Sequence, residues 1–445
     1  MDVYQEYKGK CCTADQAVQV VKDGDWVDYG MSCAYPTALD KALARRQGGL
    51  KDIKVRNAIS CHPVAILEAD PENETFTYNL WHCSAIDRKY LDAGRAYHEP
   101  MLFRDCGSYY TRGFAPVNVA MITVAPMDRH GNFSFGLTNG CTQEMLDAAE
   151  TIIVEVNPNM PVVFGMGSDH IHVSKVQAIV ESQEAVSLAP NREPSAIDKQ
   201  IAENIFPYLH DGITLQLGIG GMPNALGILI AESDLKDLGM HTELMSDGYL
   251  NLYKAGKITN DKKPFQRGKG VFSICMGSKE LYEFLDHNQD VLSAPMHYVN
   301  NPETIRQLDD FISINSCIAA DLYGQVCSES AGTRHISGTG GQLDFVTGAY
   351  AADHGKAFLA MPSSRVDKQG IRHSNILSRF TAGDIITTPR TQAPYMVTEY
   401  GVANLSGLAT WQRAEALINI AHPDVREDLI KAAEAQHIWR RSNKC

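Results

Sequence analysis

Long apolar runs are absent from this chain. Nowhere in its 445 residues is there a run approaching the roughly 18 uninterrupted apolar residues that a membrane-spanning helix needs. The start, Met1 to Lys8, has neither the basic region nor the apolar core of a signal peptide. We therefore expect a cytoplasmic protein that has no membrane partner.

The chain also has fewer basic than acidic residues. The chain has 40 Lys and Arg against 53 Asp and Glu, a formal net charge of −13. A surface that binds duplex nucleic acid needs clustered Lys and Arg, so we expect no nucleic-acid partner. The charge leaves room for a small anionic ligand, which backbone N–H groups can hold.

Cysteine spacing gives no framework for disulfides or metal. The eleven cysteines are scattered without a C-x-x-C pair, and the adjacent Cys11 and Cys12 cannot easily bridge each other. This pattern is typical of reduced thiols. His170 and His172 lack a Cys or carboxylate at ligand spacing, so we expect no metal site.

The chain contains a faint internal repeat. Three segments of the first half are each followed about 190 residues later by a related one, in the same order. The pairs are Asp23–Gly30 with Asp211–Gly218 (211 − 23 = 188), Leu50–Ile53 with Leu235–Leu238 (235 − 50 = 185) and Asp128–Phe133 with Asp321–Val326 (321 − 128 = 193). Three ordered matches at nearly constant offset indicate a duplicated domain.

The polar, proline-bracketed stretch Leu188–Pro194 has the composition of a linker. It predicts an N-terminal domain over 1–188 and a C-terminal domain over 195–445. Short apolar strands alternate with amphipathic helices, which predicts two tandem, internally duplicated open α/β domains with parallel-rich sheets. In the second half we expect strands at 213–217, 271–276, 311–319, 356–361 and 394–399.

A glycine-rich loop is the strongest local feature. It consists of Gly218, Ile219, Gly220, Gly221 and Met222, between a predicted strand and a helix that we expect to start near Pro223. Such N–H groups can hold an oxyanion or a phosphate. Pro223 breaks the G-x-G-x-x-G dinucleotide pattern, and a plain tight turn is the alternative. The second glycine cluster, Ser337–Phe345, favours a ligand-facing loop over a linker.

The repeat singles out Glu243. Through the second pair of segments it aligns with Ala58 (243 − 185 = 58), and both positions fall in predicted strands. A carboxylate forms strands poorly and is costly to bury unpaired, so Glu243 is a candidate catalytic residue. The alternative is a glutamate held in a salt bridge at a domain interface.

A carboxylate nucleophile suits acyl exchange. Its attack on a thioester gives a mixed anhydride, which keeps the acyl group activated, whereas a serine nucleophile would give an ordinary ester. No G-x-S-x-G elbow competes with it.

At these residues the chain resembles the acetyl-CoA hydrolase/transferase family, a branch of the glutamate-dependent CoA-transferases. The likeness runs over nearly the whole chain. The matching stretches are Gly218–Asn224, His241–Glu243, Asp321–Gln325, Gly338–Phe345, Thr398–Gly401 and Trp411–Glu415.

The resemblance implies two tandem α/β domains and ping-pong kinetics through a glutamyl-CoA thioester on Glu243. It implies CoA contacts along Gly218 to Met222, and near Ile318 and Gly341. Acyl-CoA and short-chain carboxylates would be the substrates, and no cofactor would be permanently bound. The protein would be a homo-oligomer, either a dimer or a tetramer. The closest likeness is to transferases that pass CoA from butyryl-CoA to acetate.

The first half departs from that likeness in Gly30–Tyr35 and Arg104–Tyr110, while Asn79–His82 still matches it. If the first domain shapes the acyl pocket, these departures leave the acyl group open. A 4-hydroxybutyrate CoA-transferase and an acyl-CoA hydrolase on the same scaffold are the alternatives.

Overall fold

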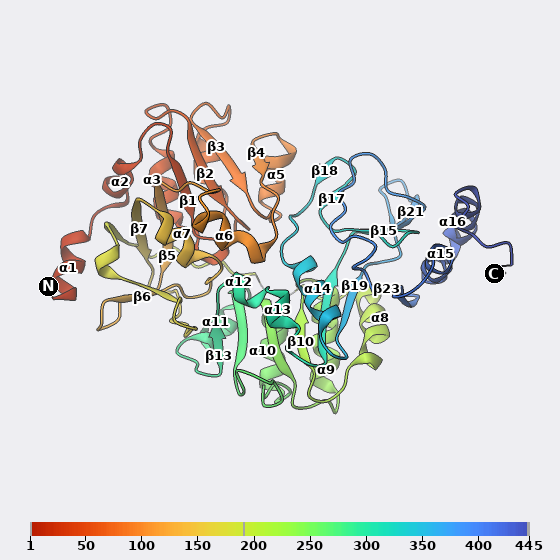
Figure 1. Ribbon diagram of the computed structural model, residues 1–445. Helices are drawn as coiled ribbons and strands as arrows, with labels where there is room; N and C mark the ends of the chain where they lie inside the picture. The colour runs from red at the N-terminus through yellow and green to blue at the C-terminus, as the bar shows by residue number, and fades with distance from the viewer. Residues whose placement is uncertain (1, 190–191, 443–445) are drawn as a thin grey trace. The chain divides into compact units, whose positions relative to one another are not determined.

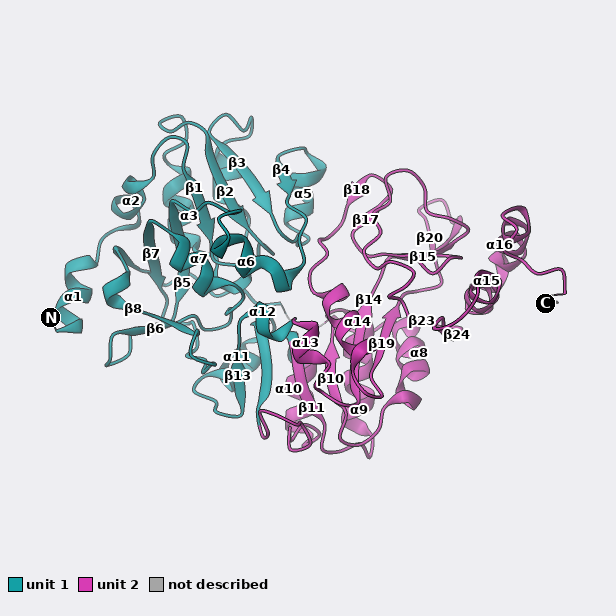
Figure 2. Ribbon diagram, viewed as in Figure 1, with its two compact units in different colours: residues 1–190, 243–247, 269–300 teal, residues 191–242, 248–268, 301–445 magenta. Residues whose placement is uncertain are grey.

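The computed structural model describes residues 2–189 and 192–442. Contacts divide the chain into two units, shown in different colours in Figure 2. The first unit comprises residues 1–190, 243–247 and 269–300, and the second comprises residues 191–242, 248–268 and 301–445. The predicted domain limits, 1–188 and 195–445, remain predictions, and Pro190 and Asn191 of the predicted linker lie outside the described residues.

A seven-stranded parallel sheet forms the centre of the first unit (Figure 1). Its order is β4-β3-β2-β1-β5-β7-β9, and every neighbouring pair is parallel. All six residues of β5 are buried, as expected for a sheet covered on both faces. The strands are β1 (Trp26–Tyr29), β2 (Ile53–Asn57), β3 (Phe76–Leu80), β4 (Ala96–His98), β5 (Val119–Val124), β7 (Thr151–Val156) and β9 (Ala178–Glu181).

Short helices connect these strands. Thr13 caps the second of them with a full capping box, which its Thr-x-x-Gln spacing predicts. The helices of the first unit are α1 (Val3–Lys10), α2 (Ala14–Ala17), α3 (Thr37–Ala44), α4 (Ala65–Ala69), α5 (Asp87–Asp92), α6 (Cys106–Thr111), α7 (Thr142–Ala148), α11 (Lys279–Leu285) and α12 (Met296–Val299). It also holds the antiparallel pair β6 (Asn132–Ser134) and β8 (His170–His172), and the parallel pair β12 (Gly270–Cys275) and β13 (Val291–Ser293).

In the second unit the strands follow the order β11-β10-β14-β19-β23-β24, and only the pairing of β23 with β24 is antiparallel among them. The strands are β10 (Thr214–Leu217), β11 (Gly239–Met245, whose last three residues belong to the first unit), β14 (Phe311–Ser316), β19 (Lys356–Ala360), β23 (Tyr395–Thr398) and β24 (Gly401–Asn404). The helices are α8 (Ala196–Ile205), α9 (Gly221–Glu232), α10 (Asp247–Lys254), α13 (Pro302–Ile305), α14 (Gln342–Ala351), α15 (Thr410–Asn419) and α16 (Pro423–Ala435).

Small sheets complete the second unit. One has the order β16-β15-β22, and two are hairpins, β17-β18 and β20-β21. Their strands are β15 (Ala319–Asp321), β16 (Val326–Cys327), β17 (Ser330–Ala331), β18 (Arg334–His335), β20 (Ser364–Val366), β21 (Arg372–Ser374) and β22 (Ile376–Leu377). Within 2–189 and 192–442, none of the helices has the length and apolar character to span a bilayer.

The duplication is visible in the strand order. The series β2-β1-β5-β7-β9 of the first unit has the same connectivity as β11-β10-β14-β19-β23. Pairing registers agree as well, because Trp26 pairs with Lys54 as Thr214 pairs with Gly239. These pairs reproduce the offsets of the sequence repeat (214 − 26 = 188 and 239 − 54 = 185). The predicted fold class, two duplicated α/β domains with parallel-rich sheets, is confirmed.

Two details differ from the prediction. The expected strand 311–319 ends at Ser316. Cys317 N–H still donates to Ala360 O of β19 at 2.9 Å, but Ile318 N–H donates to Cys327 O of β16 at 2.9 Å, so the chain leaves the large sheet there. Ala58 lies one residue beyond the end of β2, whereas Glu243 lies inside β11.

Candidate functional site

Each sheet has a topological switch point. From β1 the chain adds β2, β3 and β4 on one side and then β5, β7 and β9 on the other. In the second unit β11 and β14 flank β10 in the same way. Ligands of open α/β sheets bind beyond the carboxyl ends of strands at such points. The loop from Gly218 to Met222 follows β10 at this position, and Gly218 N–H donates to Ile314 O of β14 at 2.9 Å.

Backbone conformation explains the glycines of this loop. Gly220 has φ +119°, which disfavours a side chain, and it precedes helix α9. The helix begins at Gly221, two residues before the expected Pro223, and no side chain caps its first turn. Ile219 is 57% exposed, and Met222 is buried. The open first turn of α9 therefore presents backbone N–H groups that suit an anionic ligand.

A methyl group at Gly221 would meet Asp198 Oδ2 at 2.4 Å. Asp198 cannot move without cost, because it accepts from Ser195 N–H at 2.9 Å and Ser195 Oγ at 2.7 Å in the capping box of α8. We expect Gly221→Ala to lower the free energy of unfolding by about 1 kcal/mol, the value of a lost cap. Gly9→Ala is the control, since nothing lies within 4 Å of its added methyl group. Equal urea midpoints for the two variants would contradict this prediction.

Tyr249 fixes the end of β10 beneath the loop. Its hydroxyl accepts from Leu217 N–H at 2.7 Å and donates to Leu215 O at 3.3 Å. Beside it, Gln216 Oε1 accepts from Ser313 Oγ at 2.7 Å and from Asn315 Nδ2 at 3.0 Å. These groups hold the carboxyl ends of β10 and β14 together, and sequence reasoning did not identify them.

The other predicted CoA contacts lie in the second unit. Ile318 is half-buried in the turn between β14 and β15. Gly341 is buried at the N-cap of α14, directly after Gly340 with φ +56°. Ile318 lies two residues after the end of β14 and Gly341 lies at the start of α14, and their contact with CoA remains a prediction.

Glu243 has one amide partner. Its side chain is half-buried, and Oε2 accepts from Asn300 Nδ2 at 2.5 Å. Burial raises the pKa of Glu243 to about 7, although the hydrogen bond from Asn300 lowers it. A carboxylate of this kind ionises near neutral pH and is less solvated than a surface carboxylate, which favours nucleophilic attack.

Asn300 was missed by sequence reasoning. It is fully buried at the end of α12, 57 residues from Glu243 in the chain. The helix is held by Met296 N–H, which donates to Gly140 O at 2.8 Å, and by His297 Nδ1, which lies 2.6 Å from Glu144 Oε1. No local pattern marks Asn300, because only tertiary packing brings it to Glu243.

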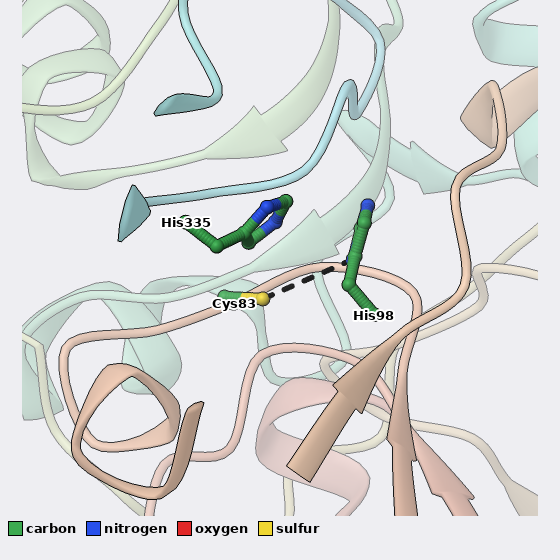
Figure 3. A group of neighbouring side chains, drawn as sticks. All are labelled: Cys83, His98 and His335. Atoms are coloured by element: carbon green, nitrogen blue, oxygen red, sulfur yellow. Dashed lines mark hydrogen bonds between the residues drawn. The ribbon is translucent and has the colours of Figure 1, made fainter. Parts of the chain in front are cut away.

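Cys83 and His98 of the first unit carry a thiol and an imidazole, two side-chain types that bind zinc. Cys83 Sγ and His98 Nδ1 lie 4.0 Å apart (Figure 3). A structural zinc site uses four ligands, so this pair alone does not form one. His170 and His172 have other partners, Asp169 and Ser174. The sequence-based expectation of no metal remains a prediction.

Two duplicated doubly wound units, a glycine loop at the switch point of the second and a half-buried carboxylate in the first indicate an α/β enzyme of the duplicated type. Residues 1–190 match the acetyl-CoA hydrolase/transferase N-terminal domain and residues 277–433 match the C-terminal domain of the same name. The chain belongs to the acetyl-CoA hydrolase/transferase family.

Individual relatives cover the chain from end to end. It is 47% identical to the butyryl-CoA:acetate CoA-transferase of Anaerostipes caccae, with 100% of both chains covered. It is 46% identical to a probable butyrate:acetyl-CoA coenzyme A-transferase of Syntrophomonas wolfei, over 99% of this chain and 98% of the relative. Among solved structures, RipA from Yersinia pestis superposes with a TM-score of 0.90 at 34% identity, over 98% and 100% of the two chains.

Proposed function

We propose that this enzyme transfers CoA from butyryl-CoA to acetate through a covalent intermediate on Glu243. The observation that carries the proposal is a carboxylate with a pKa raised to about 7 at the position where the first repeat has Ala58, one residue beyond β2. Full-length similarity to a butyryl-CoA:acetate CoA-transferase supports this choice of substrates.

The reaction proceeds in two half-reactions. The Glu243 carboxylate attacks the thioester carbonyl of butyryl-CoA and expels CoA thiolate, which leaves a butyryl–glutamyl anhydride. CoA thiolate then attacks the glutamyl carbonyl, which releases butyrate and leaves a glutamyl-CoA thioester. Acetate repeats both steps in reverse order, so acetyl-CoA leaves and the Glu243 carboxylate returns. No activation is lost, because every intermediate is an anhydride or a thioester.

CoA and the acyl group are assigned to separate stretches of the chain in this proposal. CoA lies against the loop from Gly218 to Met222, with further contacts near Ile318 and Gly341, and no cofactor is permanently bound. The acyl side is assigned to the first unit. A cytoplasmic homo-oligomer, dimer or tetramer, completes the proposal.

Transfer and hydrolysis differ in their need for acetate. Incubation with butyryl-CoA alone should release little free CoA. With acetate added, acetyl-CoA should form at least about tenfold faster than free CoA is released without acetate. Borohydride added to the acetate-free mixture should reduce the enzyme thioester and inactivate the enzyme. Free CoA released at the same rate without acetate would establish a hydrolase instead. Butyryl-CoA should also be used faster than 4-hydroxybutyryl-CoA, and the reverse order would favour the 4-hydroxybutyrate alternative.

The hydrogen bond from Asn300 lowers the pKa of Glu243, the proposed nucleophile. A hydrogen bond to a charged group contributes about 1.5–3 kcal/mol, so Asn300→Ala should raise the pKa of Glu243 by about one to two units. Because the ionised form reacts, activity falls as pH drops through this pKa. In a pH profile of kcat/KM, the acidic limb near pH 7 should therefore move to higher pH.

The neighbouring residue provides the control. Asn301 caps α13 by accepting from Glu303 N–H at 2.9 Å and is not the donor to Glu243. Asn301→Ala should leave the acidic limb in place. An unchanged limb in Asn300→Ala would show that Asn300 does not control Glu243.

A further inference from the structure

Helix α12 is a single turn whose position depends on tertiary contacts. It comprises Met296–Val299, with Pro295 before it and Asn300 after it, and Asn300 N–H donates to Met296 O at 2.9 Å. A helix of one turn is not stable by itself, so packing must fix where it lies. Asn300 is fully buried and donates to Glu243 Oε2 at 2.5 Å. Whatever holds α12 in place therefore also holds the donor to Glu243 in place.

An ionic side-chain contact anchors α12 to helix α7. At the start of the turn, Met296 N–H donates to the backbone at Gly140 O, at 2.8 Å. The next residue, His297, has its Nδ1 2.6 Å from Glu144 Oε1 of α7. A carboxylate only accepts, so His297 Nδ1 carries the proton of this hydrogen bond. His297 and Asn300 are three residues apart, which makes them neighbours on a helical turn, so the anchor acts directly beside Asn300.

The Glu144 side chain is itself confined. It is 14% exposed, whereas the His297 side chain is 55% exposed. A methyl group added to Gly107 of α6 would meet Glu144 Oε1 at 2.8 Å and Cδ at 2.9 Å, so α6 closes one side of the carboxylate. The other oxygen, Oε2, is buried and has no hydrogen-bond partner within residues 2–189 and 192–442. Glu144 therefore depends on His297, because a buried charge without a partner is costly.

The charges around α12 leave Glu144 as the partner of His297. The hydrogen bond with Glu144 raises the pKa of His297, although burial lowers it, so the imidazolium persists to higher pH. Helix α12 also packs against α6, β12 and the 3-10 turn η3 (Phe103–Asp105). In η3, Arg104 Nε lies 3.7 Å from Asp105 Oδ1, so these two charges pair with each other. The titratable groups of α6 and β12 are thiols and phenols, on Cys106, Tyr109, Tyr110 and Cys275.

We propose that Glu144 and His297 are positioning residues, whose contact holds α12 where Asn300 donates to Glu243. The inference rests on the proposed role of Glu243 as the nucleophile. Without the contact the turn can shift, and the hydrogen bond from Asn300 lengthens or breaks. Because that hydrogen bond lowers the pKa of Glu243, its loss leaves less of the reactive carboxylate near neutral pH.

Two substitutions with opposite changes of charge test this role. Glu144→Gln removes a negative charge and His297→Gln removes a positive one, so an effect through the electric field alone would move the pKa of Glu243 in opposite directions. Loss of the anchor should instead raise this pKa in both variants, by about 0.5. The ionised fraction of Glu243, and with it kcat/KM, should then be about threefold lower below pH 7.

A direct measurement of the pKa of Glu243 separates this inference from the proposed function. Carbon-13 NMR of enzyme labelled at the glutamate carboxyl carbons follows this pKa without turnover, and the signal is assigned by its loss in Glu243→Gln. The acidic limb of kcat/KM should move together with the pKa. A limb that stays in place while the pKa moves would support the anchor and overturn Glu243 as the nucleophile.

A double variant and a surface variant provide the controls. Glu144→Gln added to Asn300→Ala should move the pKa of Glu243 no further than Asn300→Ala alone, because the anchor acts through Asn300. Asp147→Asn makes the same change of charge on the exposed part of α7, where Asp147 accepts from Gln143 Nε2 at 3.0 Å. It should leave the pKa of Glu243 unchanged.

Gly107→Ala reaches the same anchor without removing a charge. Its methyl group would displace the Glu144 carboxylate from His297, so it should raise the pKa of Glu243 as well. Circular dichroism and thermal unfolding verify the fold of each variant, and His297→Gln should fold normally because the ring is more than half exposed. The proposal is overturned by shifts of opposite sign in Glu144→Gln and His297→Gln, by an unchanged pKa in both, or by a full further shift in the double variant.

Discussion

Glu243→Gln is expected to reduce CoA exchange between butyryl-CoA and acetate by a factor of roughly 10⁴ or more, the size of effect seen when an enzyme loses its nucleophile. The amide is nearly isosteric with the carboxylate and can still accept from Asn300 through its carbonyl oxygen. It has no negative charge and is a poor nucleophile, so neither the anhydride nor the glutamyl-CoA thioester forms. Borohydride should no longer inactivate the protein in the presence of butyryl-CoA.

The same variant should be at least as stable as the parent. The folded-state pKa of Glu243 is raised from an ordinary 4.5 to about 7, so the folded protein binds this proton more tightly than the unfolded chain. The free energy of unfolding therefore falls as pH rises from about 4.5 through 7. Above pH 7 the ionised Glu243 lowers it by up to about 3 kcal/mol. Glutamine removes this cost, so Glu243→Gln should unfold at higher urea than the parent at pH 8.

Glu155 provides a matched control. It is buried, its pKa is likewise raised to about 7 by burial, and it accepts from Ala38 N–H at 2.9 Å at the start of α3. Glu155→Gln makes the same chemical change away from the proposed nucleophile and should retain exchange within about threefold. Normal exchange by Glu243→Gln, measured as acetyl-CoA formed from butyryl-CoA and acetate, would exclude Glu243 as the nucleophile.

Arg56→Met should destabilise the first unit by about 3–5 kcal/mol, the usual cost of breaking a buried ion pair. The guanidinium is 4% exposed, lies 2.9 Å from Asp28 Oδ2 and 3.2 Å from Glu99 Oε2, and stacks over Trp26 at 4.4 Å. Methionine fills similar volume, but within residues 2–189 and 192–442 it leaves the buried Asp28 with the hydroxyl of Tyr110, at 2.6 Å, as its one side-chain donor. The urea midpoint of unfolding, measured by tryptophan fluorescence, should therefore fall by a large amount.

An exposed ion pair shows how much depends on burial. Arg45 Nη2 and Asp15 Oδ1 lie 2.5 Å apart, but both side chains are more than half exposed. Arg45→Met should therefore change the free energy of unfolding by less than about 1 kcal/mol. Equal losses for Arg45→Met and Arg56→Met would mean that the buried pair adds nothing beyond a surface contact.

Much of the fold could be predicted because its signals are local. The strands expected at 213–217, 271–276, 356–361 and 394–399 match β10, β12, β19 and β23 to within one or two residues, since short apolar runs between turn residues specify them. The expected strand 311–319 was too long. Cys317 and Ile318 are apolar enough to continue β14, but their N–H groups find acceptors on different elements, and sequence pattern contains no information on such partners.

Some features of the candidate site could likewise be predicted from the sequence, and others could not. Sequence by itself determined the duplication, the glycine loop at Gly218 to Met222 and the position of Glu243, because repeat offset and glycine content are properties of the chain. Only tertiary structure decided that Asn300 is the donor to Glu243 and that Arg56 pairs with Asp28. Each of these contacts joins side chains that are distant in sequence, and the free energy of burying a charge depends on which groups surround it after folding.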